Sequence, residues 1–176
     1  MRICKKILIG LMLLIVGLAV IGFFLPSHFK VERSIEISAP PEKIYPYLED
    51  PRAWSKWAVW NQRDPQMQVT YLGPEKGEGA KWLWISRSEG NGGMDFVKAE
   101  PPRLIEYKLS FPDFNMSSGG KLELTSTGAV TKMTWTNEGD VGGNIISRYF
   151  LLTMDSTVGS DFDAGMKNLK TLVEKN

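Results

Sequence analysis

The hydrophobic pattern of the chain changes twice and predicts three kinds of element. Residues 7–25 are continuously apolar, much of residues 31–138 alternates apolar and polar side chains, and residues 151–173 carry apolar side chains at every third or fourth position. These patterns are typical of a membrane span, of half-buried β-strands and of an amphipathic helix. The sequence therefore predicts an apolar helix, then a sheet, then a long helix.

The first apolar segment, Ile7 to Leu25, contains no charged residue. As a helix with a rise of ~1.5 Å per residue it spans about 28 Å, close to the ~30 Å hydrocarbon core of a bilayer. Cations precede it at Arg2, Lys5 and Lys6, and such residues usually stay on the cytoplasmic side. We therefore expect residues 1–28 to form a cytoplasmic start and a transmembrane anchor, and residues 29–176 to form one periplasmic or extracellular domain.

A cleaved secretory signal peptide is the alternative interpretation, because it also has a basic start and an apolar middle. That middle is usually roughly 7–15 residues long and ends at a cleavage site with small residues. Here the run is longer and ends in Gly22-Phe23-Phe24-Leu25-Pro26. The pattern favours an uncleaved anchor and a single-pass membrane protein.

Alternation in the middle of the chain predicts seven strands. The first is Val31–Ile37, and two short helices should follow it, one after Pro40-Pro41 and one that carries Trp54 and Trp57. The other strands are expected near residues 67–72, 80–86, 93–100, 103–111, 118–126 and 130–138. The intervening segments are short and rich in Gly, Pro, Asn and Asp, which is typical of hairpins and hence of an antiparallel sheet.

The last segment places its apolar side chains on one face of a single helix, from Leu151 to Val173. An apolar helix face must pack against something, and the sheet is the only large partner that the pattern offers. The sequence therefore predicts an α+β domain in which a curved, seven-stranded antiparallel sheet surrounds a long C-terminal helix.

This order of elements occurs with two specific stretches, ISAPPEKIYPYLEDPRAWSKWAVW and TVGSDFDAGMKNLKTLVEK. Together they resemble the polyketide cyclase-like branch of the START-like (SRPBCC) superfamily, over nearly all of residues 30–175. The resemblance implies a helix-grip (START/Bet v 1-like) fold with an apolar cavity between sheet and helix. Members of that superfamily include lipid carriers, cyclases and hydrolases, so the resemblance implies a fold more than an activity.

Composition limits the chemistry of the outer domain. His28 is the only histidine and Cys4 the only cysteine, which excludes Ser-His-Asp and Cys-His nucleophile systems and metal sites built on His or Cys. We expect no metal, no cofactor and no assigned catalytic residue. Without the three N-terminal cations the chain has 18 basic and 20 acidic side chains without runs, so nucleic acid is not an expected partner.

Aromatic side chains form the candidate site. Six tryptophans fall in three groups along the chain, and aromatic walls with few polar groups suit an apolar ligand. The predicted ligand-binding residues are Trp57, Trp82, Trp84, Met94, Phe96, Tyr107, Phe111, Trp135, Asn137, Asp155 and Phe162. Two alternatives remain: the rings simply fill the core, or Trp54 and Trp60 lie at the membrane surface.

Two of these residues are polar on otherwise apolar faces. Asp155 falls inside the apolar arc of the long helix, so it either pairs with a cation such as Arg33 or Arg148, or lines a cavity. Asn137 lies on an apolar strand face, where an unpaired amide costs roughly 1–3 kcal/mol, so it needs a partner in protein, water or ligand. An enzyme would use Asp155, Tyr107 or Asn137 to polarise a substrate and would raise the pKa of Asp155.

The sequence favours a membrane-anchored domain that binds a hydrophobic small molecule or lipid in an internal cavity. A cyclase- or hydrolase-like enzyme with a cavity carboxylate and a partner-binding module of a membrane complex are the alternatives. A space of ~300 Å³ or more between helix and sheet would favour binding. The pattern gives no oligomeric state.

Overall fold

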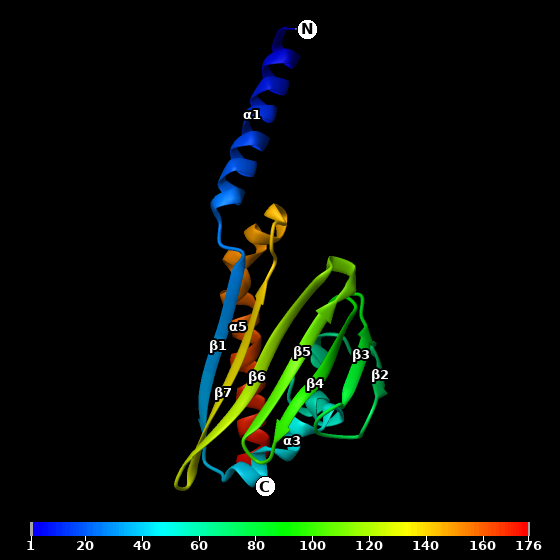
Figure 1. Cartoon of the computed structure of the whole chain (residues 1–176), viewed down its shortest axis with the longest axis vertical. Helices are drawn as coiled ribbons and strands as arrows, with labels where there is room; N and C mark the ends of the chain where they lie inside the picture. Colours follow the sequence, from blue (N-terminus) through cyan, green and yellow to red (C-terminus); the bar gives the residue numbers. More distant parts are fainter. Residues whose placement is uncertain (1, 176) are drawn as a thin grey trace.

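A computed structural model describes residues 2–175, in which a seven-stranded antiparallel sheet curves around a long helix (Figure 1). The strands are β1 (His28–Ile37), β2 (Gln68–Leu72), β3 (Lys81–Ile85), β4 (Gly92–Glu100), β5 (Leu104–Phe111), β6 (Met116–Thr127) and β7 (Val130–Asp140). The helices are α1 (Arg2–Phe24), α2 (Pro41–Ile44), α3 (Pro46–Glu49), α4 (Trp60–Arg63) and α5 (Ile145–Glu174), with 3₁₀ turns η1 (Pro51–Lys56) and η2 (Pro112–Phe114). The predicted α+β helix-grip fold is confirmed.

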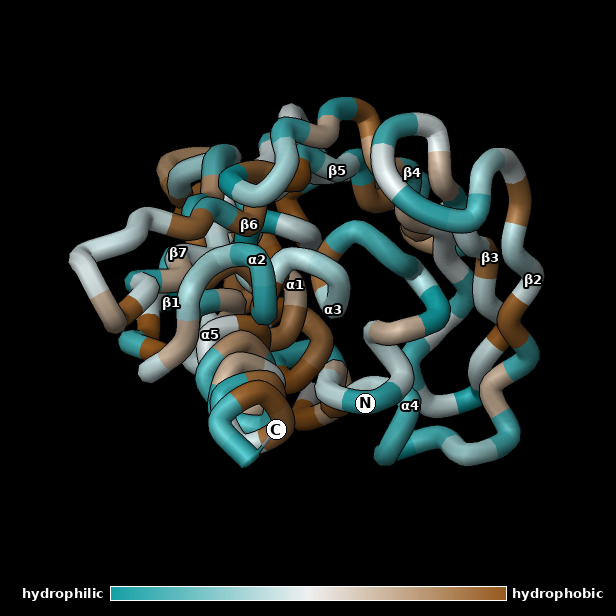
Figure 2. The backbone as a smooth tube through the Cα atoms, turned by 90° about the horizontal axis from the view of Figure 1, so that it is seen from below, coloured by the Kyte–Doolittle hydropathy of each residue, from teal (hydrophilic) through white to brown (hydrophobic). Residues whose placement is uncertain are grey.

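The strand order is β1-β7-β6-β5-β4-β3-β2, so the first strand pairs with the last and the others follow as a meander. Pairing of β1 with β7 places Val31 opposite Asn137 and Arg33 opposite Trp135. Seen from the end opposite α1, the strands form an arc from β1 to β2, with α5 inside its β1 end and the segment with α3 and α4 across the rest (Figure 2). This arc gives the domain a concave face.

Helix α5 fills part of that concave face with the apolar side chains that its period predicts. Phe162, Met166, Leu169 and Val173 are all buried, and burying each large apolar side chain contributes roughly 1.5–3 kcal/mol. A side chain at Gly159 would collide with the guanidinium of Arg33 on β1. A glycine at this position therefore allows the helix to lie close to the strand.

The helix begins at Ile145, six residues before the predicted start at Leu151. Asn144 caps its start, because the side-chain oxygen accepts a hydrogen bond from the Ser147 N–H at 3.1 Å. The additional turns extend past the sheet and contact α1 instead (Figure 1). The prediction used the apolar side chains that face the sheet, and these begin at Leu151, so it could not include the earlier turns.

Helix α1 is apolar from Ile7 to its end at Phe24 and projects from one end of the domain (Figure 1). Residues Ile3–Phe24 are long and apolar enough to cross a membrane, and a signal sequence would meet the same criteria. Its C-terminal end is held by α5: the Tyr149 hydroxyl donates to the Leu18 carbonyl at 2.5 Å, and Arg148 donates to the carbonyls of Phe23 and Leu25. A cation is favourable there because the last carbonyls of a helix are unpaired and partly negative.

Candidate functional site

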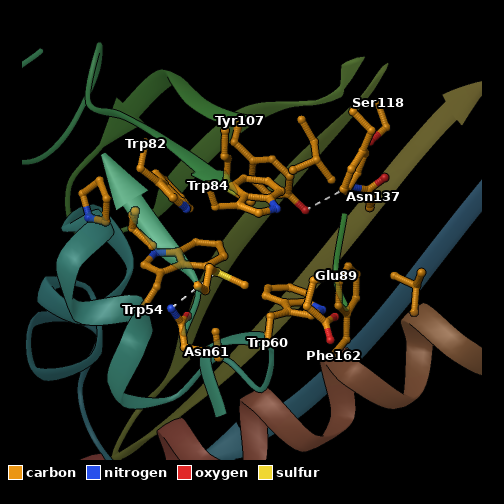
Figure 3. A pocket seen from close by; sticks show the side chains of 18 of the residues that line it. Trp54, Trp60, Asn61, Trp82, Trp84, Glu89, Tyr107, Ser118, Asn137 and Phe162 are labelled. Atoms are coloured by element: carbon orange, nitrogen blue, oxygen red, sulfur yellow. Dashed lines mark hydrogen bonds between the residues drawn. The ribbon is translucent and has the colours of Figure 1, made fainter. Parts of the chain in front are cut away.

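A cavity of about 260 Å³ lies between the inner face of the sheet, the η1–α4 segment and α5 (Figure 3). It is smaller than the ~300 Å³ given above as favouring binding, so the case for a ligand depends on the character of its walls and not on its volume. Its walls are mainly apolar, and the aromatic residues among them are Phe29, Trp54, Trp60, Tyr71, Trp82, Trp84, Tyr107, Phe111 and Phe162. The cavity is thus apolar, with a few polar side chains at defined places.

Two glycines shape the sheet side of the cavity. Trp84 pairs with Gly92 across β3 and β4, and Tyr107 pairs with Gly120 across β5 and β6. A side chain at either glycine would collide with the ring opposite it. Each ring therefore lies across the neighbouring strand rather than standing upright, which leaves open space above the sheet.

A small hydrogen-bond network forms the polar end of the cavity. The hydroxyl of Tyr107 accepts a hydrogen bond from Trp135 Nε1 at 2.9 Å. It accepts a second one from Asn137 Nδ2 at 3.3 Å (Figure 3). Burial raises the pKa of Tyr107 to about 12, so this group is a neutral phenol at physiological pH. The protein thereby supplies the partner that the Asn137 amide was expected to need, and the amide itself lines the cavity.

The structure places seven of the eleven predicted ligand-binding residues in the cavity wall. These are Trp82, Trp84, Met94, Tyr107, Phe111, Asn137 and Phe162. Trp57, Phe96 and Trp135 are fully buried behind the wall and do not line it. Trp135 stacks on Phe162, with ring centroids 4.0 Å apart, so these three residues support the wall rather than form its surface.

Asp155 lies outside the cavity, contrary to the prediction that included it in the site. Its carboxylate accepts two hydrogen bonds from Arg33, at 2.9 and 3.0 Å, and its side chain is 70% exposed. The hydrogen bond from Arg33 lowers the pKa of Asp155, whereas the enzyme hypothesis required a raised pKa. The alternative interpretation, an ion pair with Arg33, describes this residue.

The carboxylate that does line the cavity is Glu89, in the loop between β3 and β4. Arg63 Nη1 lies 3.3 Å from it, and Arg63 Nη2 pairs with Asp161. Asp161 also accepts a hydrogen bond from Trp60 Nε1 at 3.0 Å. Figure 3 shows Glu89, Trp60 and Asn61 on the α4 side of the cavity. Among residues 2–175, no three His, Cys, Asp or Glu side chains gather as a metal site.

Sequence reasoning missed part of the lining. Trp54 and Trp60, for which a membrane-surface position was the alternative, line the cavity wall. Trp54 is buried and donates to the Leu48 carbonyl at 3.0 Å. The other lining residues that were not predicted include Phe29, Asn61, Met67, Tyr71, Glu89, Leu109, Met116, Ser118, Met154 and Val158. Of these, Leu109, Met154 and Val158 carried a signal, because each lies on an apolar face.

Comparisons with known structures agree with this geometry. A protein from Mesorhizobium loti, MLL2253, superposes with a TM-score of 0.61 at 17% identity, over 84% of this chain and 98% of that one. A protein from Thermobifida fusca gives a TM-score of 0.63 at 19% identity, over 83% and 93% of the two chains. The di-domain ARO/CYC BexL from the BE-7585A biosynthetic pathway gives 0.57 at 15% identity, over 82% of this chain and 50% of that one.

These identities establish similarity of fold alone, and a search of curated proteins finds no matching relative. The family model described as polyketide cyclase / dehydrase and lipid transport matches residues 28–174. This match confirms the predicted SRPBCC resemblance across the whole sheet and α5. The chain therefore belongs to the polyketide cyclase / dehydrase and lipid transport family.

Proposed function

We propose that this protein is a membrane-anchored binding protein whose cavity holds a small, largely apolar molecule that carries one polar group. The observation that carries the proposal is the cavity of about 260 Å³, with aromatic and methionine walls and the Asn137 amide at its polar end. Apolar surface that leaves water contributes roughly 25 cal/mol per Å². The walls therefore supply affinity, and the polar end orients the ligand.

Asn137 is the residue that we assign to the polar group of the ligand. One of its N–H groups donates to Tyr107, which fixes the amide plane. Within residues 2–175 the amide makes no other hydrogen bond, so its remaining donor and acceptor are available to a carbonyl, hydroxyl or carboxylic acid. A hydrocarbon without such a group would leave the amide edge unpaired, which is costly in an apolar site.

The anchor completes the proposal. Residues 1–28 would form a cytoplasmic start and a span, and residues 29–176 a domain outside the cytoplasm. The arginine and two lysines that precede the apolar run support this orientation. A domain held at a membrane is close to the largest local source of apolar molecules.

The enzyme alternative lacks a carboxylate in the place where it was expected. Asp155 is in an exposed ion pair away from the cavity, and Glu89 is paired with Arg63 at the rim. The family description includes cyclases and dehydrases as well as lipid transport. Binding requires only the cavity and the amide, so it is the function that the geometry supports best.

The test is a pair of matched valine substitutions in the full chain, in detergent micelles with the fluorescent polyene cis-parinaric acid as the probe. Val158→Phe adds a ring to the cavity wall, whereas Val97→Phe adds the same ring at an exposed position of β4 that does not line the cavity. We expect Val158→Phe to weaken binding at least about tenfold, or ~1.4 kcal/mol, and Val97→Phe to bind as the wild type does.

Equal affinity of the two variants, or no binding by the wild type, would contradict the proposal. The identity of the polar contact is tested by Asn137→Leu, which should reduce the preference for cis-parinaric acid over an unsubstituted polyene hydrocarbon. If that preference is unchanged, Asn137 does not orient the ligand.

A further inference from the structure

The first turn of α5 lies beyond the end of the sheet, next to α1. It packs against α1, where a side chain at Gly22 would collide with Ile145 and Tyr149. The Tyr149 hydroxyl reaches the carbonyl of Leu18. Leu18 lies six residues before the end of α1, which corresponds to about 9 Å along the helix axis. The start of α5 is therefore held beside the last turns of the apolar helix.

This position has a consequence for any membrane that α1 spans. The apolar run of α1 is about as long as the hydrocarbon core is thick, and the headgroup layers add roughly 5–8 Å on each side. A segment beside the last ~9 Å of such a span lies in the outermost part of the hydrocarbon core, next to the headgroup layer. Two of its side chains, Ile146 and Phe150, are 71% and 67% exposed. Such exposure of large apolar groups is costly in water and favourable in a membrane interface.

Arg148 is the cation in this segment, and its guanidinium donates to backbone carbonyls of Phe23, Leu25 and Gly142. A long basic side chain whose charge is paired, at the end of a membrane helix, is compatible with an interfacial position. No carboxylate lies among residues 145–154. The composition of these turns is therefore that of an interfacial helix.

The exposed residues continue into the cavity as one series. Ile146, Phe150, Met154 and Val158 follow one another at intervals of four, so each contacts the next on the same side of the helix. Met154 and Val158 line the cavity. The helix thus presents an apolar track from the level of α1 to the site.

The opposite side of the opening is also apolar and exposed. Phe114 in η2 is 66% exposed, and it lies between Phe111 and Met116, which both line the cavity. Antiparallel order places the end of β5 and the start of β6 at the same end of the sheet as α1 and the start of α5 (Figure 1). At this end the lining is partly exposed, whereas at the other end Trp54 and Trp82 are buried. The cavity is therefore accessible from the end that faces α1.

We infer that the first two turns of α5, together with Phe114, insert into the membrane that α1 spans, and that the cavity takes its ligand from the adjacent leaflet. The second half of this inference rests on the proposed function and specifies its ligand class as an amphiphile that resides in the leaflet. A second part of the lining is also partly exposed, beside α4, where Asn61 and Met67 lie. Entry of the ligand from water through this side is the competing route.

Insertion is tested in the full chain with Cys4→Ser as background and one new cysteine at a time. Phe150→Cys and Phe114→Cys report on the proposed interface. Leu72→Cys is the control, because Leu72 is 44% exposed and ends β2 at the end of the sheet that lies away from α1. An environment-sensitive fluorophore is attached to each, and the protein is reconstituted in phosphatidylcholine vesicles. We expect blue-shifted emission and quenching by spin-labelled lipids at positions 150 and 114 but not at position 72.

Water-like emission at positions 150 and 114 would overturn the inference and assign the exposed patch to a protein partner. Entry is tested by loading cis-parinaric acid from the same vesicles and following energy transfer from tryptophan. Val158→Phe, whose cavity is filled, gives the signal of probe that remains in the membrane, and this signal is subtracted. Phe150→Asp should slow loading roughly tenfold, because a carboxylate disfavours insertion. Its affinity in micelles should match that of Leu72→Asp.

Equal loading rates of Phe150→Asp and Leu72→Asp would overturn entry from the leaflet and indicate the route beside α4. If the wild type binds no probe in vesicles or micelles, the proposed function and the entry route both fail. The fluorophore at position 150 still decides insertion in that case, because its signal requires no ligand.

Discussion

Replacing Tyr107 with phenylalanine tests the polar end of the cavity in its simplest form. The ring and its position over Gly120 remain, and only the hydroxyl is lost. That hydroxyl is the acceptor for Trp135 Nε1 and Asn137 Nδ2. The substitution therefore leaves two donors without their partner.

The structure distinguishes the costs of these two donors. Trp135 is 1% exposed and lies behind the cavity wall, so its N–H cannot reach water, and a buried unpaired donor costs ~1–3 kcal/mol. The Asn137 amide faces the cavity and can donate to water there, so the loss of its hydrogen bond to Tyr107 costs little free energy. We expect Tyr107→Phe to lower the free energy of unfolding by about 2 kcal/mol, or a Tm lower by about 4–8 °C for a chain of this size.

Thermal unfolding of the full chain in micelles, followed by near-ultraviolet circular dichroism, measures this loss. Tyr71→Phe is the matched control, because Tyr71 also lines the cavity but its hydroxyl makes no hydrogen bond within residues 2–175. We expect the control to change stability by less than about 0.5 kcal/mol. Equal losses in the two variants would refute the view that the Tyr107 hydroxyl joins the wall to the core.

Three further results are expected. Asp155→Asn should destabilise the protein at neutral pH. The difference from the wild type should disappear as the pH falls through the folded-state pKa of Asp155, which the hydrogen bond from Arg33 holds below its ordinary value. Urea unfolding between neutral and acidic pH measures this difference, and a constant difference would contradict the ion pair. Gly22→Val should speed hydrogen exchange in the first turns of α5 because of the collision there, whereas Gly10→Val, in open space, should not; equal effects would argue against docking of the two helices. Burial raises the pKa of Tyr107 from 10 to about 12, so its phenol should keep its proton until well above pH 10, and stability should fall as the pH rises from 10 through about 12. The difference in ultraviolet phenolate absorbance between the wild type and Tyr107→Phe measures this titration. A Tyr107 phenol that titrates near pH 10 would contradict the burial.

The positions of the strands along the chain and their inward faces could be predicted because alternation is a local property. The pairing of β1 with β7 joins distant segments, so alternation could not show it. Val31–Ile37, for example, lies within the observed β1 and points its alternate side chains as expected. The start of α5 could not, because its first turns face α1 rather than the sheet. Sequence period identifies a face but not what the face contacts.

The limit within the site has the same origin. The alternation of side chains along the strands places Trp82, Phe96 and Trp135 on the inner side of the sheet, but only Trp82 reaches the cavity surface. The difference arises from contacts between distant segments, such as the stacking of Trp135 on Phe162. Likewise, helical phase placed Asp155 within the apolar arc, and only the approach of Arg33 from β1 shows that it is paired at the surface. Core and cavity share a pattern, so three-dimensional packing is needed to separate them.

The junction between α1 and the domain determines how far the domain can travel. Only residues 25–27 separate α1 from β1, and Arg148 and Tyr149 clamp the helix end to α5. If α1 spans a membrane as proposed, a domain held in this way stays close to the membrane surface. A ligand taken up by the proposed cavity would then leave only to a carrier that comes to the domain.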